Sequence, residues 1–149
     1  MALLLISSDL LLRIRKEAAS AFPEECCGLL IGERRSDDRI KVHDLVPAAN
    51  VAPDRRQRFE VDPAVHLRCQ RALRGTGRRV VGHYHSHPGG RAEPSFRDIE
   101  SISDPALIWV IVAVGTDMDV GEIRAWRVKD DMSGFHEIPG LADELGQED

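Results

Sequence analysis

The segment Leu107 to Val114 reads LIWVIVAV and carries neither a charged side chain nor a hydroxyl group. An uninterrupted apolar run of this kind is typical of a strand that is covered on both faces, so it predicts a central position in a sheet. A second run, Cys26 to Ile31 (CCGLLI), is also apolar throughout and closes on Gly32. Strands of this character indicate a sheet with helices on its faces.

Weaker patterns predict further strands and three helices around these two segments. Strands are expected at residues 3–6, 40–46, 59–61, 79–87, 122–128 and 135–138, the last of them at an edge. Helices are expected from Ser7 or Ser8 to Pro23, from Asp62 or Pro63 to Leu73, and from Ser95 to about Ile102. Short turns join some strands and helices join others, which predicts an α/β fold of three layers, a mixed β-sheet flanked by helices.

Two of the predicted helices have residues that are expected to face the core. In the first helix these are Leu11, Leu12, Ala18, Ala19 and Phe22. In the second helix they are Ala64, Val65, Ala72 and Leu73. The polar connection at residues 47–58 is long for a plain turn, and we expect it to be mobile or functional.

The chain has 149 residues, of which 42% are hydrophobic and 30% charged, and this fits a soluble globular protein. We expect a single domain over residues 1–140 and a flexible acidic tail over residues 141–149. The formal net charge of −5 has the wrong sign for a nucleic-acid-binding protein, and the composition argues against a membrane span. Basic clusters at residues 55–58 and 71–79 are interpreted as solvated surface, with docking of an acidic partner as the alternative.

The start of the chain and its cysteines indicate the compartment. Asp9 interrupts the first apolar run, positive charges follow that run, and no cleavage site of small residues is found, so no signal peptide is predicted. Cys26, Cys27 and Cys69 form neither an even disulfide framework nor a C-x-x-C pair. These features predict a cytoplasmic protein in which Cys26 and Cys27 are buried strand residues and not nucleophiles.

Residues 82–98, GHYHSHPGGRAEPSFRD, contain two local patterns that have ordinary explanations when taken singly. Side chains two apart in a strand share a face, so His83, His85 and His87 point the same way. Such alternation alone is more typical of a half-exposed strand than of a metal site. Ser95 followed by Asp98 is, by itself, a capping box at the start of a helix.

The combination of the two patterns favours a metal site. A strand that ends in two histidines is followed, after one turn, by a helix whose first turn carries Asp98, and the chain geometry brings this carboxylate near the end of the strand. Two imidazoles and one carboxylate leave a tetrahedral zinc with one open position for water, as in hydrolytic sites. Nitrogen and oxygen donors suit zinc, and they also suit iron and manganese.

These residues resemble the JAMM metalloproteases, the catalytic branch of the MPN (Mov34/PAD) domains. The family pattern is His-Ser/Thr-His-Pro, six residues, then Ser-x-x-Asp, and the chain matches it without a gap from His85 to Asp98. The upstream glutamate of the family stands in a Pro-x-Glu-x-Cys-Gly-Leu-Leu context, which residues 23–30 match and which selects Glu25 over Glu24. The order of elements over residues 3–138 also looks like this family, which implies its deaminase-like MPN fold.

The resemblance implies a role for each matching residue. His85, His87 and Asp98 would ligate Zn²⁺. Glu25 would act as the general base for the zinc-activated water, and Ser95 would stabilise the oxyanion. His83 has no role in the family pattern; it is interpreted as a surface residue, with a supporting position beside the ligands as the alternative.

The resemblance also implies a substrate class. Family members cleave peptide or isopeptide bonds after the C-terminal tail of ubiquitin or a ubiquitin-like protein, and short prokaryotic members are associated with small β-grasp sulfur carriers. The chain is therefore interpreted as a zinc peptidase that acts behind a Gly-Gly tail, which could bind by strand addition at a sheet edge near the zinc. The alternatives are a non-catalytic MPN scaffold and a zinc hydrolase of a small-molecule amide. The oligomeric state is left open.

Overall fold

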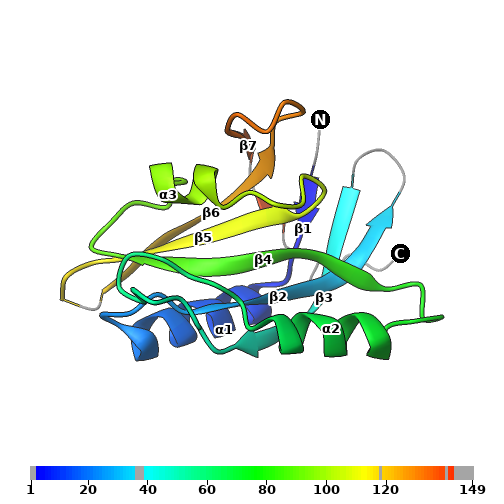
Figure 1. Cartoon of the computed structure of the whole chain (residues 1–149), viewed down its shortest axis with the longest axis horizontal. Coiled ribbons are helices and arrows are strands. Elements are labelled where there is room, and N and C mark those ends of the chain that lie inside the picture. Colours follow the sequence, from blue (N-terminus) through cyan, green and yellow to red (C-terminus); the bar gives the residue numbers. More distant parts are fainter. Residues whose placement is uncertain (1–2, 36–38, 118, 140, 143–149) are drawn as a thin grey trace.

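The computed structural model describes residues 3–35, 39–117, 119–139 and 141–142 (Figure 1). It contains an eight-stranded sheet in the order β7-β6-β5-β4-β2-β3-β1-β8. The strands are β1 (Leu3–Leu5), β2 (Cys27–Arg35), β3 (Arg39–Ala48), β4 (Arg79–Pro88), β5 (Ile108–Val114), β6 (Val120–Val128), β7 (Phe135–Ile138) and β8 (Leu141–Ala142). β4 pairs in parallel with β5, and β1 pairs in parallel with β3 and β8, whereas the other pairs are antiparallel, so the predicted mixed sheet is confirmed.

The most apolar run of the sequence forms an interior strand. β5 is hydrogen-bonded to β4 on one side and to β6 on the other, and all of its residues except Ala113 are buried. β7 lies at one end of the strand order. The predictions of a central strand at residues 107–114 and of an edge strand at residues 135–138 are both confirmed.

Helices cover both faces of the sheet, which confirms the predicted three layers. α1 (Ser8–Ala21) lies on the face to which Tyr84 points, and the Tyr84 hydroxyl donates a hydrogen bond of 2.8 Å to the Glu17 carboxylate of α1. α2 (Pro63–Ala72) and α3 (Phe96–Glu100) lie on the opposite face, to which the alternate residues of β4 point. Within the described residues, none of the helices combines the length and the apolar character that crossing a membrane requires.

The stripe that α1 buries differs from the predicted one. The buried residues are Leu10, Ile14 and Ala18, which are spaced four apart, whereas Leu12 is 48% exposed. The predicted stripe began at Leu11, one position too late, and each residue turns a helix by about 100°. Of the residues predicted to face the core, Ala18 is confirmed as buried, and Leu11 and Phe22 are partly buried and pack against the core. The prediction for Leu12 is wrong.

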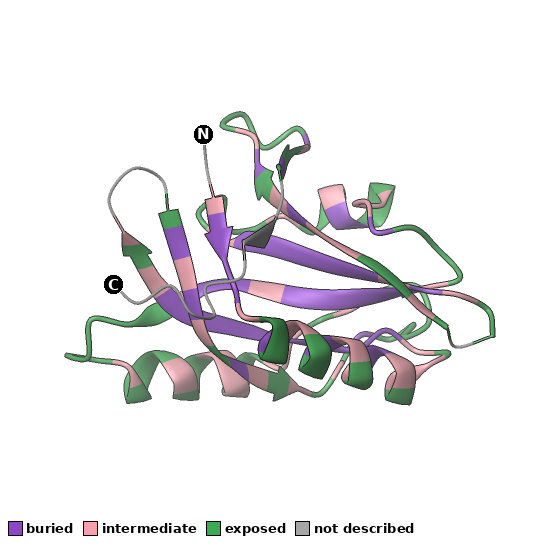
Figure 2. Ribbon diagram, turned by 180° about the vertical axis from the view of Figure 1, so that it is seen from behind, coloured by how far each residue is buried: buried purple, intermediate pink, exposed green. Residues whose placement is uncertain are grey.

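α2 has the predicted start but contributes no buried residue. Asp62 is its N-cap and Pro63 its first residue, as predicted. Ala64 and Ala72, which were expected in the core, are exposed. Figure 2 shows this helix only in the colours of exposed and intermediate residues. The reason is that the main hydrophobic core lies on the other face, between the sheet and α1, so the apolar residues of α2 have no core to enter.

Three segments differ from their predicted extent. β2 continues past Gly32 to Arg35, so the polar turn before β3 is shorter than expected. The strand expected at residues 59–61 is reduced to a single bridge between Asn50 and Val61. The first two residues of the expected tail form β8 beside β1, and the rest of it, residues 143–149, lies outside the described residues.

Replacing Leu10 by Ala should lower the free energy of unfolding by about 2–5 kcal/mol, because a buried leucine side chain is removed and a cavity remains. Replacing Leu12 by Ala is the matched control, and this change on the exposed side of α1 should cost less than about 1 kcal/mol. Urea unfolding followed by circular dichroism measures both values. Equal losses would show that α1 presents a different side to the sheet.

Candidate metal centre

Three donor side chains converge between the end of β4 and the start of α3. His85 and His87 occupy alternate positions of β4, and their Nε2 atoms lie 3.0 Å apart. Asp98 approaches from α3, with its Oδ2 3.0 Å from His87 Nε2 and its Oδ1 3.4 Å from His85 Nε2. All three residues are buried. The structure thus brings together the three residues that were predicted as metal ligands.

The capping box at Ser95 positions Asp98. The Ser95 Oγ accepts a hydrogen bond of 3.1 Å from the Asp98 N–H, and the Asp98 Oδ2 accepts one of 2.8 Å from the Ser95 N–H. The turn that leads to this cap includes Gly89 at a φ of 71°, a left-handed conformation that favours glycine. The capping and the metal interpretations of Asp98 are compatible, because the same carboxylate caps α3 and faces both histidines.

Glu25 reaches the same point from the residues that precede β2. One of its carboxylate oxygens and the ligand nitrogens of His85 and His87 all lie within 4.8 Å of one another. The segment is fixed to β4 by the Cys26 N–H, which donates to the Ser86 Oγ at 2.8 Å. Glu25 is only 6% exposed, and its Oε1 is buried without a hydrogen-bond partner among the described residues. Such an oxygen is costly to bury, which points to a group that the site would bind.

The surroundings of His87 fit a metal cation. Its Nδ1 lies 2.8 Å from the carbonyl oxygen of Arg91, which can only accept, so Nδ1 carries a hydrogen. Burial opposes protonation of this ring, but the Nε2 atom faces the Asp98 carboxylate, which raises the pKa of His87 because a proton between the two groups is favoured. A metal cation would take the place of this proton. The donor atoms of the three residues lie 3.0 to 3.4 Å apart. In a tetrahedral zinc site with metal–ligand distances of about 2.0 Å, two ligand atoms are about 3.3 Å apart, which is close to these separations. The three residues therefore fit zinc.

Burial and the mutual charges of the site set its protonation. Burial raises the pKa of Glu25 to about 8 and lowers the pKa of His85. Burial also opposes ionisation of Asp98, but the two histidines outweigh it and hold the pKa of this carboxyl well below its usual range. Asp98 is therefore ionised, as a metal ligand must be, whereas Glu25 can gain or lose a proton near neutral pH.

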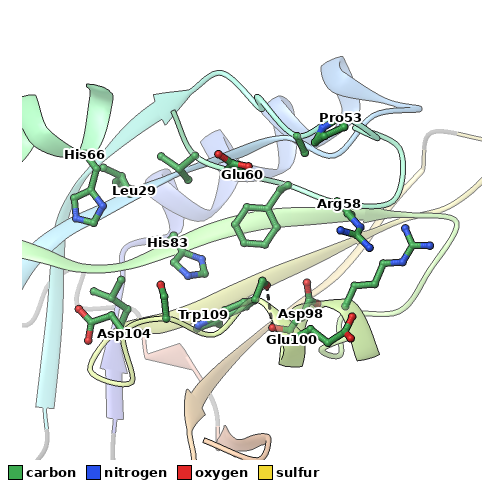
Figure 3. Close-up of a pocket in the computed structure, with 17 residues that line it drawn as sticks. Leu29, Pro53, Arg58, Glu60, His66, His83, Asp98, Glu100, Asp104 and Trp109 are labelled. Carbon is green, nitrogen blue, oxygen red and sulfur yellow. Dashed lines mark hydrogen bonds between the residues drawn. The ribbon is translucent and has the colours of Figure 1, made fainter. Parts of the chain in front are cut away.

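A pocket of about 430 Å³ adjoins the metal centre on the histidine face of the sheet (Figure 3). Asp98 lies toward one end of the pocket, and His66 of α2 lies at the other. Pro53 and Arg58, from the connection between β3 and α2, form part of its wall, so this connection does border the site. The apolar lining includes Leu29, Phe59, Val61, Leu107 and Trp109.

His83 lines this pocket, so its interpretation as a surface residue is wrong. The residue is half-buried, and its ring centroid lies 4.4 Å from that of Trp109 and 5.3 Å from that of Phe59. Its Nδ1 is buried without a hydrogen-bond partner among the described residues, and burial lowers its pKa to about 3. Strand alternation placed His83 on the correct face. It could not reveal that rings from β5 and from a distant loop cover the residue.

Phe59 and Asn50 also belong to the site, and the sequence did not single them out. The Phe59 ring stacks on the His85 ring with centroids 4.0 Å apart. The Asn50 side-chain amide donates to the carbonyl oxygens of Glu25 at 3.0 Å and of Arg58 at 2.9 Å, and its Oδ1 accepts two backbone N–H groups of the same loop. Asn50 thereby fastens the loop to the segment that carries Glu25. An asparagine in a polar loop gives no sequence signal for this role.

Cys26 and Cys27 are buried, as predicted. Burial raises the pKa of the Cys26 thiol to about 11 and that of the Cys27 thiol to about 12. Both thiols are therefore neutral near pH 7, and neither has the thiolate character of a nucleophile.

Comparison with known proteins identifies the family. A family model described as prokaryotic homologs of the JAB domain matches residues 7–129. The chain belongs to this family. The resemblance to the JAMM proteins, which rested on the residues from Glu25 to Asp98, is thereby confirmed.

Two named relatives and one solved structure illustrate the similarity. The chain is 34% identical over 103 residues to the desampylase of Haloferax volcanii, which covers 69% of this chain and 72% of that protein. It is 31% identical over 127 residues to the CysO-cysteine peptidase of Mycobacterium tuberculosis, with 85% and 84% covered. The solution structure of a protein from Desulfitobacterium hafniense matches with a TM-score of 0.80 and 29% identity over 95% of this chain and 94% of that one.

Proposed function

We propose that this family member is a zinc-dependent peptidase or isopeptidase that hydrolyses the bond after the C-terminal Gly-Gly tail of a small β-grasp, ubiquitin-like sulfur-carrier protein. The observation that carries the proposal is the convergence of His85, His87 and Asp98 beside the unpartnered carboxylate of Glu25. The names of the relatives, a desampylase and a CysO-cysteine peptidase, support hydrolysis of a carrier conjugate.

The metal would be held by the three residues at the end of β4 and the start of α3. His85 and His87 offer their Nε2 atoms, and Asp98 offers its carboxylate. When bound, zinc supplies a Lewis acid and lowers the pKa of a coordinated water to about 7. Three protein ligands leave one position open for water or substrate, which is typical of catalytic zinc sites.

Glu25 and Ser95 would move the proton and stabilise the developing charge. The Oε1 of Glu25 has no hydrogen-bond partner among the described residues, so in its ionised form it would accept a proton. Burial raises the pKa of this carboxyl, which would let the same group hold that proton and return it to the leaving amine. The Ser95 Oγ accepts the Asp98 N–H, so its hydroxyl hydrogen remains available to donate to an oxyanion.

The tail of the substrate would reach the metal through the pocket described above. Strand addition beside the histidines is not available, because β4 is hydrogen-bonded to β2 on one side and to β5 on the other. Strand addition at a sheet edge near the zinc stays a prediction. An extended tail in the pocket would instead pass Phe59 and His83 to reach Asp98, and glycines let a backbone approach such groups closely.

A β-grasp carrier whose Gly-Gly tail is extended by a short peptide should be cleaved after the second glycine, and mass spectrometry of the products locates the bond. Changing both glycines to alanine should lower kcat/KM by about 10- to 100-fold, because added methyl groups must fit beside the rings of the pocket. Simple amides, such as those of cysteine, serve as the comparison. Equal or faster hydrolysis of these amides would favour a small-molecule hydrolase instead.

A further inference from the structure

α2 and the turn that follows it present an exposed basic surface, which we call the arginine face. It consists of Arg68, Arg71, Arg74, Arg78 and Arg79, all of them exposed. The sequence from residue 63 to residue 81 contains no aspartate or glutamate, although the whole chain has a net charge of −5. Within the described part of the chain, no ion pair joins any of the five arginines to a carboxylate. The arginine face therefore concentrates one sign of charge on an otherwise acidic protein.

The local structure does not account for this concentration of charge. Arg68 and Arg71 are three residues apart in α2, so they are neighbours on the helix surface, and like charges at this spacing oppose helix formation. Arg74 follows in the turn directly after the C-cap Leu73. α2 buries no residue that would offset the repulsion. The helix dipole favours cations in the last turn, which helps Arg71, but Arg78 and Arg79 lie beyond the helix.

The arginine face adjoins the pocket that leads to the metal centre. Arg74, Arg78 and Arg79 line a second pocket. This pocket shares His66, Leu107 and one carboxylate, Asp104, with the first pocket. Figure 3 shows His66 at the end of the first pocket that lies away from the metal centre. The second pocket, which the arginines line, therefore adjoins the His66 end of the pocket that leads to the metal centre.

We propose that the arginine face docks an acidic surface on the folded body of the carrier protein whose tail enters the pocket. This inference rests on the proposed function and adds the charge of the partner to it. If the tail reaches Asp98 from the direction of His66, the folded domain of the carrier lies over α2, beside the exposed arginines. Charge complementarity of this kind accelerates encounter and selects among partners of similar shape.

The test compares three zinc-loaded enzymes on two substrates. The enzymes are the wild type, the double variant Arg74→Glu/Arg78→Glu, and the control Arg39→Glu/Arg127→Glu, which makes the same charge change at exposed positions of β3 and β6 outside both pockets. The substrates are a β-grasp carrier with an acidic surface and an extended Gly-Gly tail, and a short peptide that contains that tail alone.

For the whole carrier at low salt, the Arg74→Glu/Arg78→Glu variant should show a KM raised by about tenfold or more with kcat unchanged. The control variant should match the wild type. Raising NaCl from about 0.05 to 0.5 M should raise the KM of the wild type and remove most of the difference, because salt screens surface charges. The tail peptide should be cleaved equally by all three enzymes, since it does not reach the arginine face.

Equal KM values for the carrier in all three enzymes, with the peptide still cleaved, would overturn the docking proposal and leave the proposed function standing. If the wild type cleaves neither substrate, the proposed function is wrong. Docking is then tested by calorimetric titration of each enzyme with the intact carrier. Equal affinities of the wild type and the double variant for the carrier would refute the docking proposal. A double variant that binds the carrier normally but loses binding to duplex DNA or to phosphatidylserine vesicles would assign the arginine face to nucleic acid or membrane and overturn the proposal.

Discussion

Replacing Glu25 by Gln should lower the rate of carrier hydrolysis by at least about a thousandfold while zinc remains bound. Glutamine has nearly the shape of glutamate, but its amide cannot take a proton from water or return one to the leaving amine. The zinc content should stay at about one per chain, because His85, His87 and Asp98 are unchanged. Steady-state cleavage and elemental analysis of the same preparation measure the two quantities.

Glu24 provides the matched control for this substitution. It is the preceding residue, its side chain is 43% exposed, and it pairs with Arg55 at 3.1 Å on the surface. Glu24→Gln should therefore change the rate by less than about twofold. Loss of zinc from Glu25→Gln would contradict the assigned role. The Glu25 carboxylate lies near the ligand nitrogens of both histidines, so this result would make Glu25 a metal ligand and not a base.

Replacing His87 by Ala should weaken zinc binding by more than about 100-fold and abolish hydrolysis, because two ligands remain where three are needed. Zinc added to the metal-free wild type should raise its melting temperature, since a metal that binds only the folded state stabilises it. The same addition should leave the melting temperature of His87→Ala nearly unchanged. Titration with zinc and differential scanning calorimetry measure the two effects.

His136→Ala is the control, because this histidine is exposed on β7 and lies outside the metal centre. It should bind zinc and respond to it as the wild type does. A His87→Ala protein that retains stoichiometric zinc with unchanged affinity would mean that the metal is held elsewhere. The cluster at His85 and Asp98 would then be only a buried hydrogen-bonded group.

The parts of the site that follow local rules could be predicted from the sequence. The period of two in β4 places His85 and His87 on one face, and the capping box fixes Asp98 within one helical turn of Ser95. The family motif then selected Glu25 from two adjacent acids. These arrangements depend on residues close in sequence, or on a motif that already encodes a distant contact.

The parts that depend on long-range packing could not be predicted. His83 is covered by Trp109 and Phe59, which come from another strand and from a loop, and no local pattern announces that they meet. The buried stripe of α1 was misplaced because Leu10 and Leu11 are equally apolar, and only the sheet beneath decides which one turns inward. The exposed position of α2 likewise follows from the location of the core on the opposite face.

The double duty of Asp98, as helix cap and as a side chain facing both histidines, has a consequence for the affinity of the metal centre. Because the cap hydrogen bonds hold the carboxylate when α3 folds, its rotational freedom is lost before any ion arrives, and binding does not have to order it again. The first turn of α3 therefore acts on metal affinity without touching the ion, and a change that loosens this turn would weaken binding even with all three ligands in place.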